Sequence, residues 1–403
     1  MNVTIVHPRV FLGGAEIVVA RLAEDLQNMG HKVNLAVTEI DPEGHLGNCS
    51  GLKCVTSENR LVKSVSKKLR QKLGPNIISE TVYEIPTLRD MITGTLDRCD
   101  VINPHGYPSY WACACFADKR PIVWNCNEVY PEFLRSFRDP SLLRRIKYSL
   151  RASLIEPLDT YIVRRYIDIV VVLSELNRQR VKEHYGRDCL IVRSPVDDLF
   201  FEKCETSAVV SKYELMNSFV VLQVGWLQSE KRPVTTLIAT RLLVKKIPNL
   251  KTVFAGGGPQ HAYLVRKAYE LGIRKNIVFT DSVSQQDVRQ LYHACDVNVF
   301  PALEHSWGLT PFEALASGRI SVVSSRTGAA ELIGPNDVGV VVYPTPRNLA
   351  EAIYDIYSHR EKYEDKLARG RELVEKRLRR KIYARKMIEI YKKAVDEKPR
   401  LNN

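Results

Sequence analysis

The sequence predicts an α/β protein with two doubly wound domains, each built on a parallel sheet covered by helices. First, short β-branched runs alternate with segments whose apolar residues recur at helical spacing, which is typical of such sheets. Second, this alternation restarts at residue 219, after a stretch at 195–217 that has few apolar runs. Third, a chain of 403 residues is long enough for two or three domains of roughly 150 residues each.

The elements expected in the first half follow in order along the chain. A strand at 3–6 leads into a turn at Gly13 and Gly14, and Ile17, Leu22 and Leu26 then recur at helical spacing. Each further apolar run is expected to be a buried strand, and these runs lie at 33–37, 101–102, 121–124, 169–173 and 190–192.

The second half repeats the scheme, and a long basic helix is expected at its end, over 367–395. The expected strands, separated by helix-length segments, lie at 219–224, 250–255, 277–279, 297–300 and 320–323. We divide the chain into an N-terminal Rossmann-like domain at 1–205, a C-terminal Rossmann-like domain at 206–375 and a basic helix at 376–403. Whether that helix packs back on the first domain is open from the sequence.

The net charge of +13 comes from 59 Lys and Arg against 46 Asp and Glu, in a chain of ordinary hydrophobic content. This composition excludes a disordered, fibrous or disulfide-stapled miniprotein. Basic residues cluster at 60–72, 141–151 and 366–393, and the remainder of the chain nets −6. Such clusters indicate a polyanionic partner, although a solvated helix face explains any single run equally well.

Nine cysteines show no C-x-x-C spacing, and no D-x-D motif occurs, so we expect isolated thiols and no metal site. The N-terminus lacks a basic start followed by an apolar block, and no apolar run approaches roughly 20 residues. We therefore expect a cytoplasmic protein whose contact with a membrane is peripheral.

Several turns at strand ends have residues suited to phosphate. Gly13 and Gly14 lie between a strand and a helix, whose N-terminal amides and dipole favour an anion. In the second half, Lys231 and Arg232 precede a helix, where a lysine can pair with phosphate, and glycines at 256–258 follow the next strand. A tight strand–helix turn explains each glycine motif alone, but their recurrence favours a phosphate ligand.

The most informative stretch is 300–333. A strand is followed by a loop with Glu304 and His305, which are suited to bind sugar hydroxyls. Residues 308–310 open a helix whose first amides can hold a phosphate, and Glu313 lies one turn further on. Glu313 can accept hydrogen bonds from a ribose diol, or it can simply complement the helix dipole.

These motifs resemble the retaining glycosyltransferases of family 4, which read E-x7-E within E-x-F-G-L-x-x-x-E-A-x-A-x-G. The matching positions here are Gly308, Glu313, Ala314, Ala316 and Gly318, and further matches lie at 13–16, 174–175, 193–197, 256–259 and 327–331. The resemblance spans almost the whole chain. It implies the GT-B architecture, in which two Rossmann-like domains face a central cleft, and a nucleotide diphosphate sugar as co-substrate without metal or other cofactor.

The sequence departs from the family pattern at two positions. Eight residues before Glu313 lies His305 instead of the first Glu, and Glu304 is one residue early. Either Glu304 acts through an inserted loop residue or His305 takes the position. Trp226 stands where the family has an Arg that grips the pyrophosphate together with the Lys.

By resemblance, the catalytic candidates are His105, which corresponds to an N-domain histidine near the reacting sugar, and Glu304 or His305. The donor-binding candidates are Gly13, Gly14, Lys231, Arg232, Gly308, Leu309, Thr310 and Glu313.

The resemblance implies that a hexose is moved from GDP-mannose or a UDP-sugar to a hydroxyl of a lipid-linked or membrane-associated glycan. One alternative is a nucleotide-sugar epimerase of the same fold, which needs no acceptor. Another is a non-catalytic basic nucleic-acid-binding protein, but the basic runs lack interleaved aromatics, so we expect no nucleic acid partner. Apolar residues at 142, 143, 146, 150 and 154 alternate with basic ones, which suits peripheral binding to an anionic membrane.

Overall fold

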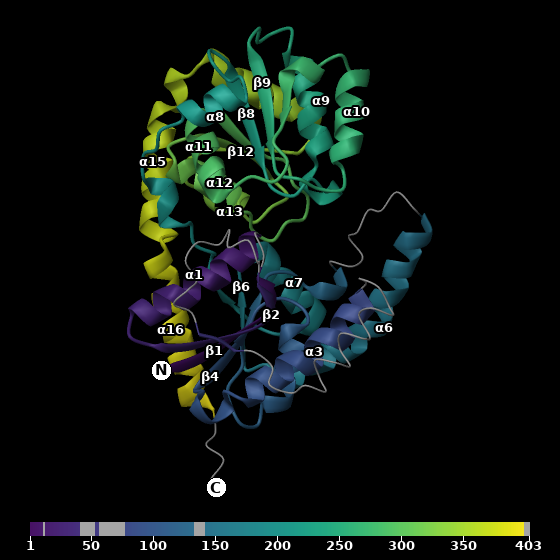
Figure 1. Cartoon of the computed structure of the whole chain (residues 1–403), viewed down its shortest axis with the longest axis vertical. Coiled ribbons are helices and arrows are strands. Elements are labelled where there is room, and N and C mark those ends of the chain that lie inside the picture. Colours follow the sequence, from purple (N-terminus) through teal and green to yellow (C-terminus); the bar gives the residue numbers. More distant parts are fainter. Residues whose placement is uncertain (11–12, 41–52, 56–76, 133–141, 399–403) are drawn as a thin grey trace. The chain divides into compact units, whose positions relative to one another are not determined.

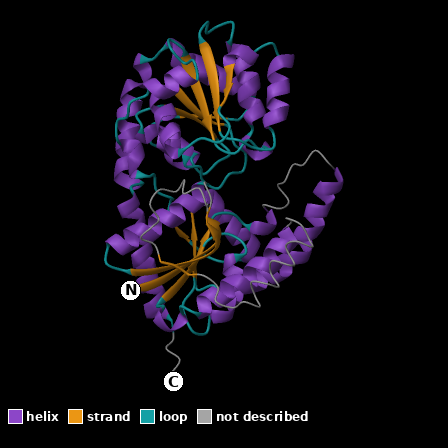
Figure 2. Cartoon of the chain, in the orientation of Figure 1, coloured by secondary structure: helices purple, strands orange, loops and turns teal. Residues whose placement is uncertain are grey.

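The computed structural model describes residues 1–10, 13–40, 53–55, 77–132 and 142–398. The chain forms two compact units, Met1–Arg193 with Arg380–Asn403, and Ser194–Arg379. Each unit has a parallel sheet with helices around it, which confirms the predicted α/β class (Figures 1 and 2). The chain leaves the first unit at residue 193, twelve residues before the boundary drawn from the sequence.

The sheet of the first unit has the strand order of a doubly wound fold. Its strands are β1 (Asn2–Val10), β2 (Lys32–Ile40), β3 (Lys53–Val55), β4 (Val101–Pro104), β5 (Val123–Cys126), β6 (Ile169–Val172) and β7 (Leu190–Ile191). The order β3-β2-β1-β4 continues into β5-β6-β7, because the Ile102 amide donates to the Pro121 carbonyl at 2.9 Å. All strand pairs are parallel.

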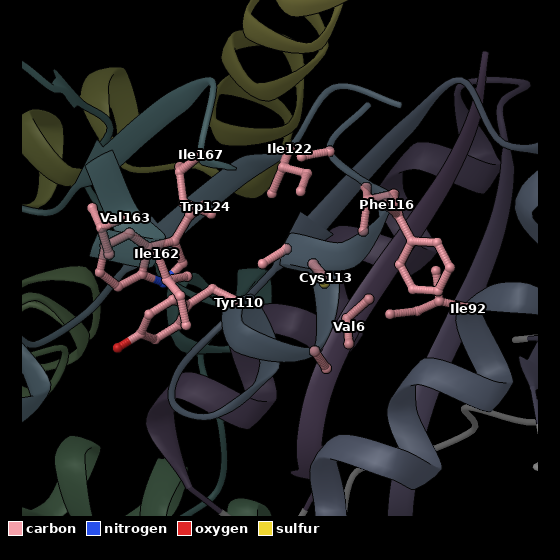
Figure 3. Packing of buried hydrophobic residues seen from close by; sticks show 14 of the residues in the cluster. Val6, Ile92, Tyr110, Cys113, Phe116, Ile122, Trp124, Ile162, Val163 and Ile167 are labelled. Carbon is pink, nitrogen blue, oxygen red and sulfur yellow. The ribbon is translucent and has the colours of Figure 1, made fainter. Parts of the chain in front are cut away.

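Helices of the first unit enclose this sheet and contribute residues to its core. They are α1 (Gly14–Asn28), α3 (Ile77–Thr93), α4 (Ser109–Cys113), α6 (Leu142–Tyr166), α7 (Glu175–Tyr185) and α16 (Arg380–Glu397). In Figure 3, Val6 of β1 lies near Cys113 of α4, and Trp124 of β5 lies between Tyr110 of α4 and Val163 of α6. These residues are almost fully buried, so the apolar strand runs seen in the sequence form the centre of the unit.

The second unit repeats the topology. Its strands are β8 (Phe219–Val224), β9 (Leu250–Ala255), β10 (Ile277–Phe279), β11 (Val297–Phe300), β12 (Ile320–Ser324) and β13 (Val340–Val342). Its helices are α8 (Ser207–Lys212), α9 (Pro233–Leu243), α10 (His261–Glu270), α11 (Gln285–Ala294), α12 (Thr310–Ala316), α13 (Ala330–Ile333), α14 (Pro346–Ser358) and α15 (Glu361–Arg377). The parallel order β10-β9-β8-β11-β12-β13 again places the first strand beside the fourth.

The expectation of one long basic helix over 367–395 is wrong, because this segment forms two helices, α15 and α16. Leu378 and Arg379 lie between the two helices, and the Leu378 carbonyl accepts a hydrogen bond from the Val196 amide at 2.8 Å. Leu378 is also buried, so packing and a strand-like bridge outweigh the helical pattern of the local sequence. The residues of α16 belong to the first unit, where Arg380 forms ion pairs with Glu24 and Asp25 of α1.

Among the described residues, eight cysteines are free thiols, of which Cys99, Cys113, Cys126 and Cys295 are buried. No described helix is long and apolar enough to cross a membrane. The basic cluster at 60–72 lies outside the described residues.

Candidate functional site

Both sheets reverse their strand order at one point, and the candidate residues lie at those points. The order reverses between β1 and β4 in the first unit and between β8 and β11 in the second. Ligands of doubly wound sheets bind outside the carboxyl ends of the strands at such a switch point. His105 directly follows β4, whereas Lys231 follows β8 and His305 follows β11. Within the second unit, the topology therefore brings together Lys231 and His305, which are 74 residues apart in the sequence.

In the second unit, Lys231 contacts His305 directly. The Lys231 Nζ lies 2.5 Å from His305 Nε2 and 5.2 Å from the centre of the Phe300 ring. Because the ammonium group can only donate, His305 offers the lone pair of Nε2 and carries its ring proton on Nδ1. The ammonium group of Lys231 thus lies between the His305 imidazole and the face of the Phe300 ring.

Backbone contacts hold this pair in position. The Lys231 carbonyl accepts a hydrogen bond from Gln223 Nε2 at 2.9 Å, and the His305 carbonyl accepts one from the Gly328 amide at 3.0 Å. Gly308 has a φ of 108°, and a Cβ at this position would lie 2.5 Å from the Phe300 ring. Only glycine therefore lets the loop turn tightly past Phe300.

Glu304 points to a different partner from His305. Its Oε1 accepts a hydrogen bond from Arg326 Nε at 2.8 Å, and the same carboxylate also contacts Arg326 Nη2. The residue has a φ of 54°, in the left-handed region that is uncommon for side chains with a Cβ. Of the two alternatives left open by the sequence, His305 is the residue beside Lys231, and Glu304 forms an ion pair with Arg326.

Glu313 lies in the first turn of α12, and the pKa of its carboxyl group is raised. Its Oε2 accepts a hydrogen bond from the buried Tyr292 hydroxyl at 2.8 Å. Burial raises the pKa of Glu313 to about 7, with a smaller upward contribution from Asp197, while the Tyr292 hydrogen bond opposes the rise. The residue as a whole is partly exposed. A buried carboxyl group with a raised pKa is typical of a functional site, so complementing the helix dipole does not by itself explain Glu313.

The remaining candidates have different local roles. Arg232 is the left-handed residue before α9, and its Nε donates to Thr235 Oγ1 at 3.0 Å. Leu309 and Thr310 begin the short helix α12. In the first unit, Gly13 caps α1 and Gly14 is its first residue. A Cβ at Gly13 would lie 2.2 Å from Glu16 Oε2, because that carboxylate folds back over the start of α1.

His105 is buried in the first unit beside a second histidine that the sequence reasoning did not select, His7. Burial lowers the pKa of His105 to about 3 and that of His7 to about 4, so both are neutral at pH 7. His7 is the last-but-three residue of β1, and its Nδ1 accepts a hydrogen bond from the Arg9 amide at 3.3 Å. The signal available in the sequence was a histidine between the first strand run and the glycine turn.

A buried network fixes the tautomer of His105. Asn103 Oδ1 accepts hydrogen bonds from His105 Nε2 at 2.8 Å and from the Tyr391 hydroxyl of α16 at 2.7 Å. The amide of Asn103 cannot be flipped, because its Nδ2 donates to the Val123 carbonyl and to Asn125 Oδ1. His105 therefore carries its proton on Nε2, and Nδ1 is an acceptor. The C-terminal helix thus helps to position His105 through Asn103.

We expect Tyr391→Phe to lower the free energy of unfolding by about 1 kcal/mol, because one buried hydrogen bond to Asn103 is lost. Denaturant melts measure this change. The Nε2–H tautomer of His105 should persist in nitrogen-15 NMR spectra, because Asn103 still accepts from it. Tyr383→Phe, which removes the partner of Asn125 Nδ2 at 2.9 Å, is the matched control on the same helix. An Nδ1–H tautomer in the wild-type protein would contradict the network.

One further residue was missed, Tyr292, because nothing in its local sequence marks it. Tyr292 is one of several apolar positions of α11. Trp226, at the position of the family's arginine, is 58% exposed at the end of β8. Within the described ranges, no group of three His, Cys, Asp or Glu residues is arranged to hold a metal ion.

Comparison with known proteins assigns a family to each half of the chain. The family model "Glycosyl transferases group 1" matches residues 210–373, and "Glycosyltransferase Family 4" matches residues 12–198. The matched regions together contain both switch points described above.

Two curated relatives and one solved structure illustrate the similarity. An uncharacterized glycosyltransferase of Methanocaldococcus jannaschii is 34% identical over 140 residues, 34% of this chain and 36% of that protein. The GDP-mannose-dependent α-(1-6)-phosphatidylinositol dimannoside mannosyltransferase of Mycobacterium tuberculosis is 31% identical over 206 residues, 51% of this chain and 53% of that protein. These matches span only about a third to a half of the relatives' length.

The solved structure shares the fold over nearly the whole chain. It is Anabaena Alr3699/HepE in complex with UDP-glucose, with a TM-score of 0.78, 17% identity and coverage of 98% of this chain and 100% of that one. At this identity the likeness concerns the fold.

Proposed function

This chain belongs to the family 4 glycosyltransferases of the GT-B fold, and we propose that it transfers a hexose from a nucleotide diphosphate sugar to an acceptor hydroxyl, with retention of the anomeric configuration. The observation that carries the proposal is the contact of Lys231 with His305 at the switch point of the second sheet. A cation at this place has a role in the departure of a diphosphate, because negative charge develops on the leaving oxygen.

Each residue of the second unit has a part in the proposed step. Lys231 stabilises the departing diphosphate, and Glu313 accepts hydrogen bonds from the ribose hydroxyls of the donor. His305, held beside Lys231, binds the sugar in place of the family's first Glu, and Glu304 instead orients Arg326. The bond from the sugar C1 to the phosphate oxygen breaks, the acceptor oxygen bonds to C1, and the acceptor proton passes to the leaving phosphate.

For the first unit, we propose that His105 contacts the sugar or the acceptor. It is neutral at pH 7 and its Nδ1 has a free lone pair in this tautomer, so Nδ1 can accept a hydrogen bond from a hydroxyl group. Gly13 and Gly14 supply the backbone approach for the donor phosphates. The proposed reaction needs no metal or other cofactor.

The donor and acceptor classes rest on the relatives. The Mycobacterium tuberculosis relative is named for GDP-mannose and phosphatidylinositol dimannoside, and the Anabaena structure holds UDP-glucose. We propose a GDP- or UDP-hexose as donor and a lipid-linked glycan as acceptor. The alternative of an epimerase predicts turnover of the donor without any acceptor.

A thermal-shift panel of GDP-, UDP- and ADP-hexoses tests the donor. At 100 times its dissociation constant, the cognate donor stabilises the folded state by about 2.7 kcal/mol, which raises Tm by roughly 5–10 °C for a unit of this size. One nucleotide class should give this shift and the others little. The absence of any shift across the panel, together with no transfer activity, would refute the proposal.

A further inference from the structure

Helix α6 of the first unit exposes a continuous apolar stripe. Its members are between 48% and 81% exposed, and they are Ile146, Leu150, Leu154, Leu158 and Tyr161. They follow one another at intervals of four or three residues, so they lie on one side of the helix. Single exposed leucines are ordinary on protein surfaces, but five large apolar residues in register along one helix are not.

The rotation of α6 about its axis is set by its buried face. Ala152, Asp159 and Val163 on that face are fully buried. The Asp159 carboxylate accepts hydrogen bonds from the Tyr110 hydroxyl at 2.5 Å, from Trp111 Nε1 at 2.6 Å and from the Tyr185 hydroxyl at 2.6 Å. This anchored carboxylate holds the helix in one orientation, so the stripe faces away from the unit. In Figure 1 the first turns of α6 reach beyond the other labelled helices of the unit.

Basic residues strongly outnumber acidic ones in α6. Its six basic residues are Arg144, Arg145, Lys147, Arg151, Arg164 and Arg165, against the two acidic residues Glu156 and Asp159. Asp159 is buried, and Glu156 Oε1 lies 3.5 Å from His184 Nδ1 of α7. Neither acid belongs to the stripe. Arg151 lies three residues before Leu154, and Arg165 lies four residues after Tyr161, so both adjoin the stripe on the helix surface.

We infer that this stripe, flanked by Arg151 and Arg165, is the surface on which the chain docks to an anionic lipid bilayer. Apolar side chains of an interfacial helix enter the boundary between headgroups and acyl chains, and nearby basic residues are attracted to lipid phosphates. A bilayer satisfies both features at once and does not require a partner of complementary shape. The inference concerns α6 alone and does not depend on the proposed transfer reaction.

Vesicle co-sedimentation of the full chain tests the inference, with vesicles of phosphatidylcholine alone or mixed equally with phosphatidylglycerol. We expect binding to the mixed vesicles at low salt and weaker binding to the neutral ones. Leu150→Ser with Leu154→Ser should lower the partition coefficient at least tenfold (about 1.4 kcal/mol). The serine side chains no longer gain free energy by burying apolar surface in the bilayer. Arg151→Gln with Arg165→Gln should remove most of the preference for the anionic vesicles and its salt dependence.

The matched control replaces two exposed apolar residues of the second unit. Met216 and Leu242 are 71% and 48% exposed, so Met216→Ser with Leu242→Ser removes similar surface elsewhere and should leave vesicle binding unchanged. The changed residues of the stripe are on the surface, so circular dichroism should show unaltered folding. Donor binding by thermal shift should also persist in the stripe variant, which separates this test from that of the proposed function.

Three outcomes would overturn the inference. One is the absence of binding to anionic vesicles at low salt. Another is equal binding by the wild-type chain and the stripe variant. The third is a wild-type chain that is a dimer in light scattering and does not bind vesicles, together with a stripe variant that is a monomer. A second copy of the chain would then cover the stripe.

Discussion

Lys231→Ala is expected to lower the rate of sugar transfer at least a hundredfold, about 2.7 kcal/mol in the activation barrier. The lysine is the cation that the structure places at the end of β8, against His305 and the face of Phe300. A preorganised positive charge acts on the leaving diphosphate at the moment when its charge develops, and water replaces it poorly. Steady-state kinetics on the purified, folded variant measure kcat and kcat/KM.

Lys231→Arg and Arg232→Ala are the controls for this prediction. The arginine keeps the charge but not the shape of the ammonium group, so it should recover only part of the rate. The side chain of Arg232 bonds to Thr235 within its own helix start, and its loss should cost much less. Near-normal transfer by folded Lys231→Ala would refute the assignment of the site.

The same assay distinguishes the two residues before α12. Because His305 contacts Lys231 and Glu304 pairs with Arg326, we expect His305→Ala to be the more damaging change. If Glu304→Ala alone abolishes transfer, the loop carries an insertion and the acidic role of the family is kept by Glu304.

Glu313→Ala is the second large effect, with an expected loss of at least a hundredfold in transfer. The variant removes both acceptor oxygens from the place where we propose that the ribose hydroxyls bind. Glu313→Gln is the sharper variant, because its amide oxygen can still accept from Tyr292 while the negative charge is gone. It should also impair the affinity for the nucleotide, measured by calorimetry. Unchanged affinity and rate in both variants would contradict the proposed role.

The raised pKa of Glu313 predicts a pH dependence of nucleotide binding in the wild-type protein. A carboxyl group with a pKa of about 7 is mostly protonated at pH 6 and mostly ionised at pH 8. Affinity should therefore fall about tenfold between pH 8 and pH 6, and Glu313→Gln should remove this dependence.

The same pKa has a consequence for stability with a definite sign. Between the ordinary pKa of 4.5 and about 7, the folded state binds more protons at Glu313 than the unfolded state does, so stability falls as pH rises. The loss is complete above pH 7 and amounts to about 3 kcal/mol. Glu313→Gln should therefore unfold at a higher temperature than wild type at pH 8 and at a similar one at pH 4.5. This behaviour would mark Glu313 as a residue kept for its ligand at a cost in stability.

The fold was largely predictable, because its signal is local. Buried parallel strands are short apolar runs, and residues 219–224 and 250–255 coincide with β8 and β9. The break between α15 and α16 was not predictable, because Leu378 leaves its helical pattern for a hydrogen bond with Val196, 182 residues earlier in the chain. A distant contact of this kind has no trace in the pattern around Leu378.

The sequence by itself determined the fold class, the repeated strand and helix pattern, the family, and the positions of Lys231, His305 and Glu313. Motifs carry such information because the residue types and their spacing are local. Only the tertiary structure decided which groups meet: His305 rather than Glu304 beside Lys231, Tyr292 on Glu313, and Tyr391 behind His105. It also decided that one side of α6 is anchored by Asp159 and the other is exposed. Contacts and desolvation depend on residues brought together by the topology of the sheets, and these lie far apart along the chain.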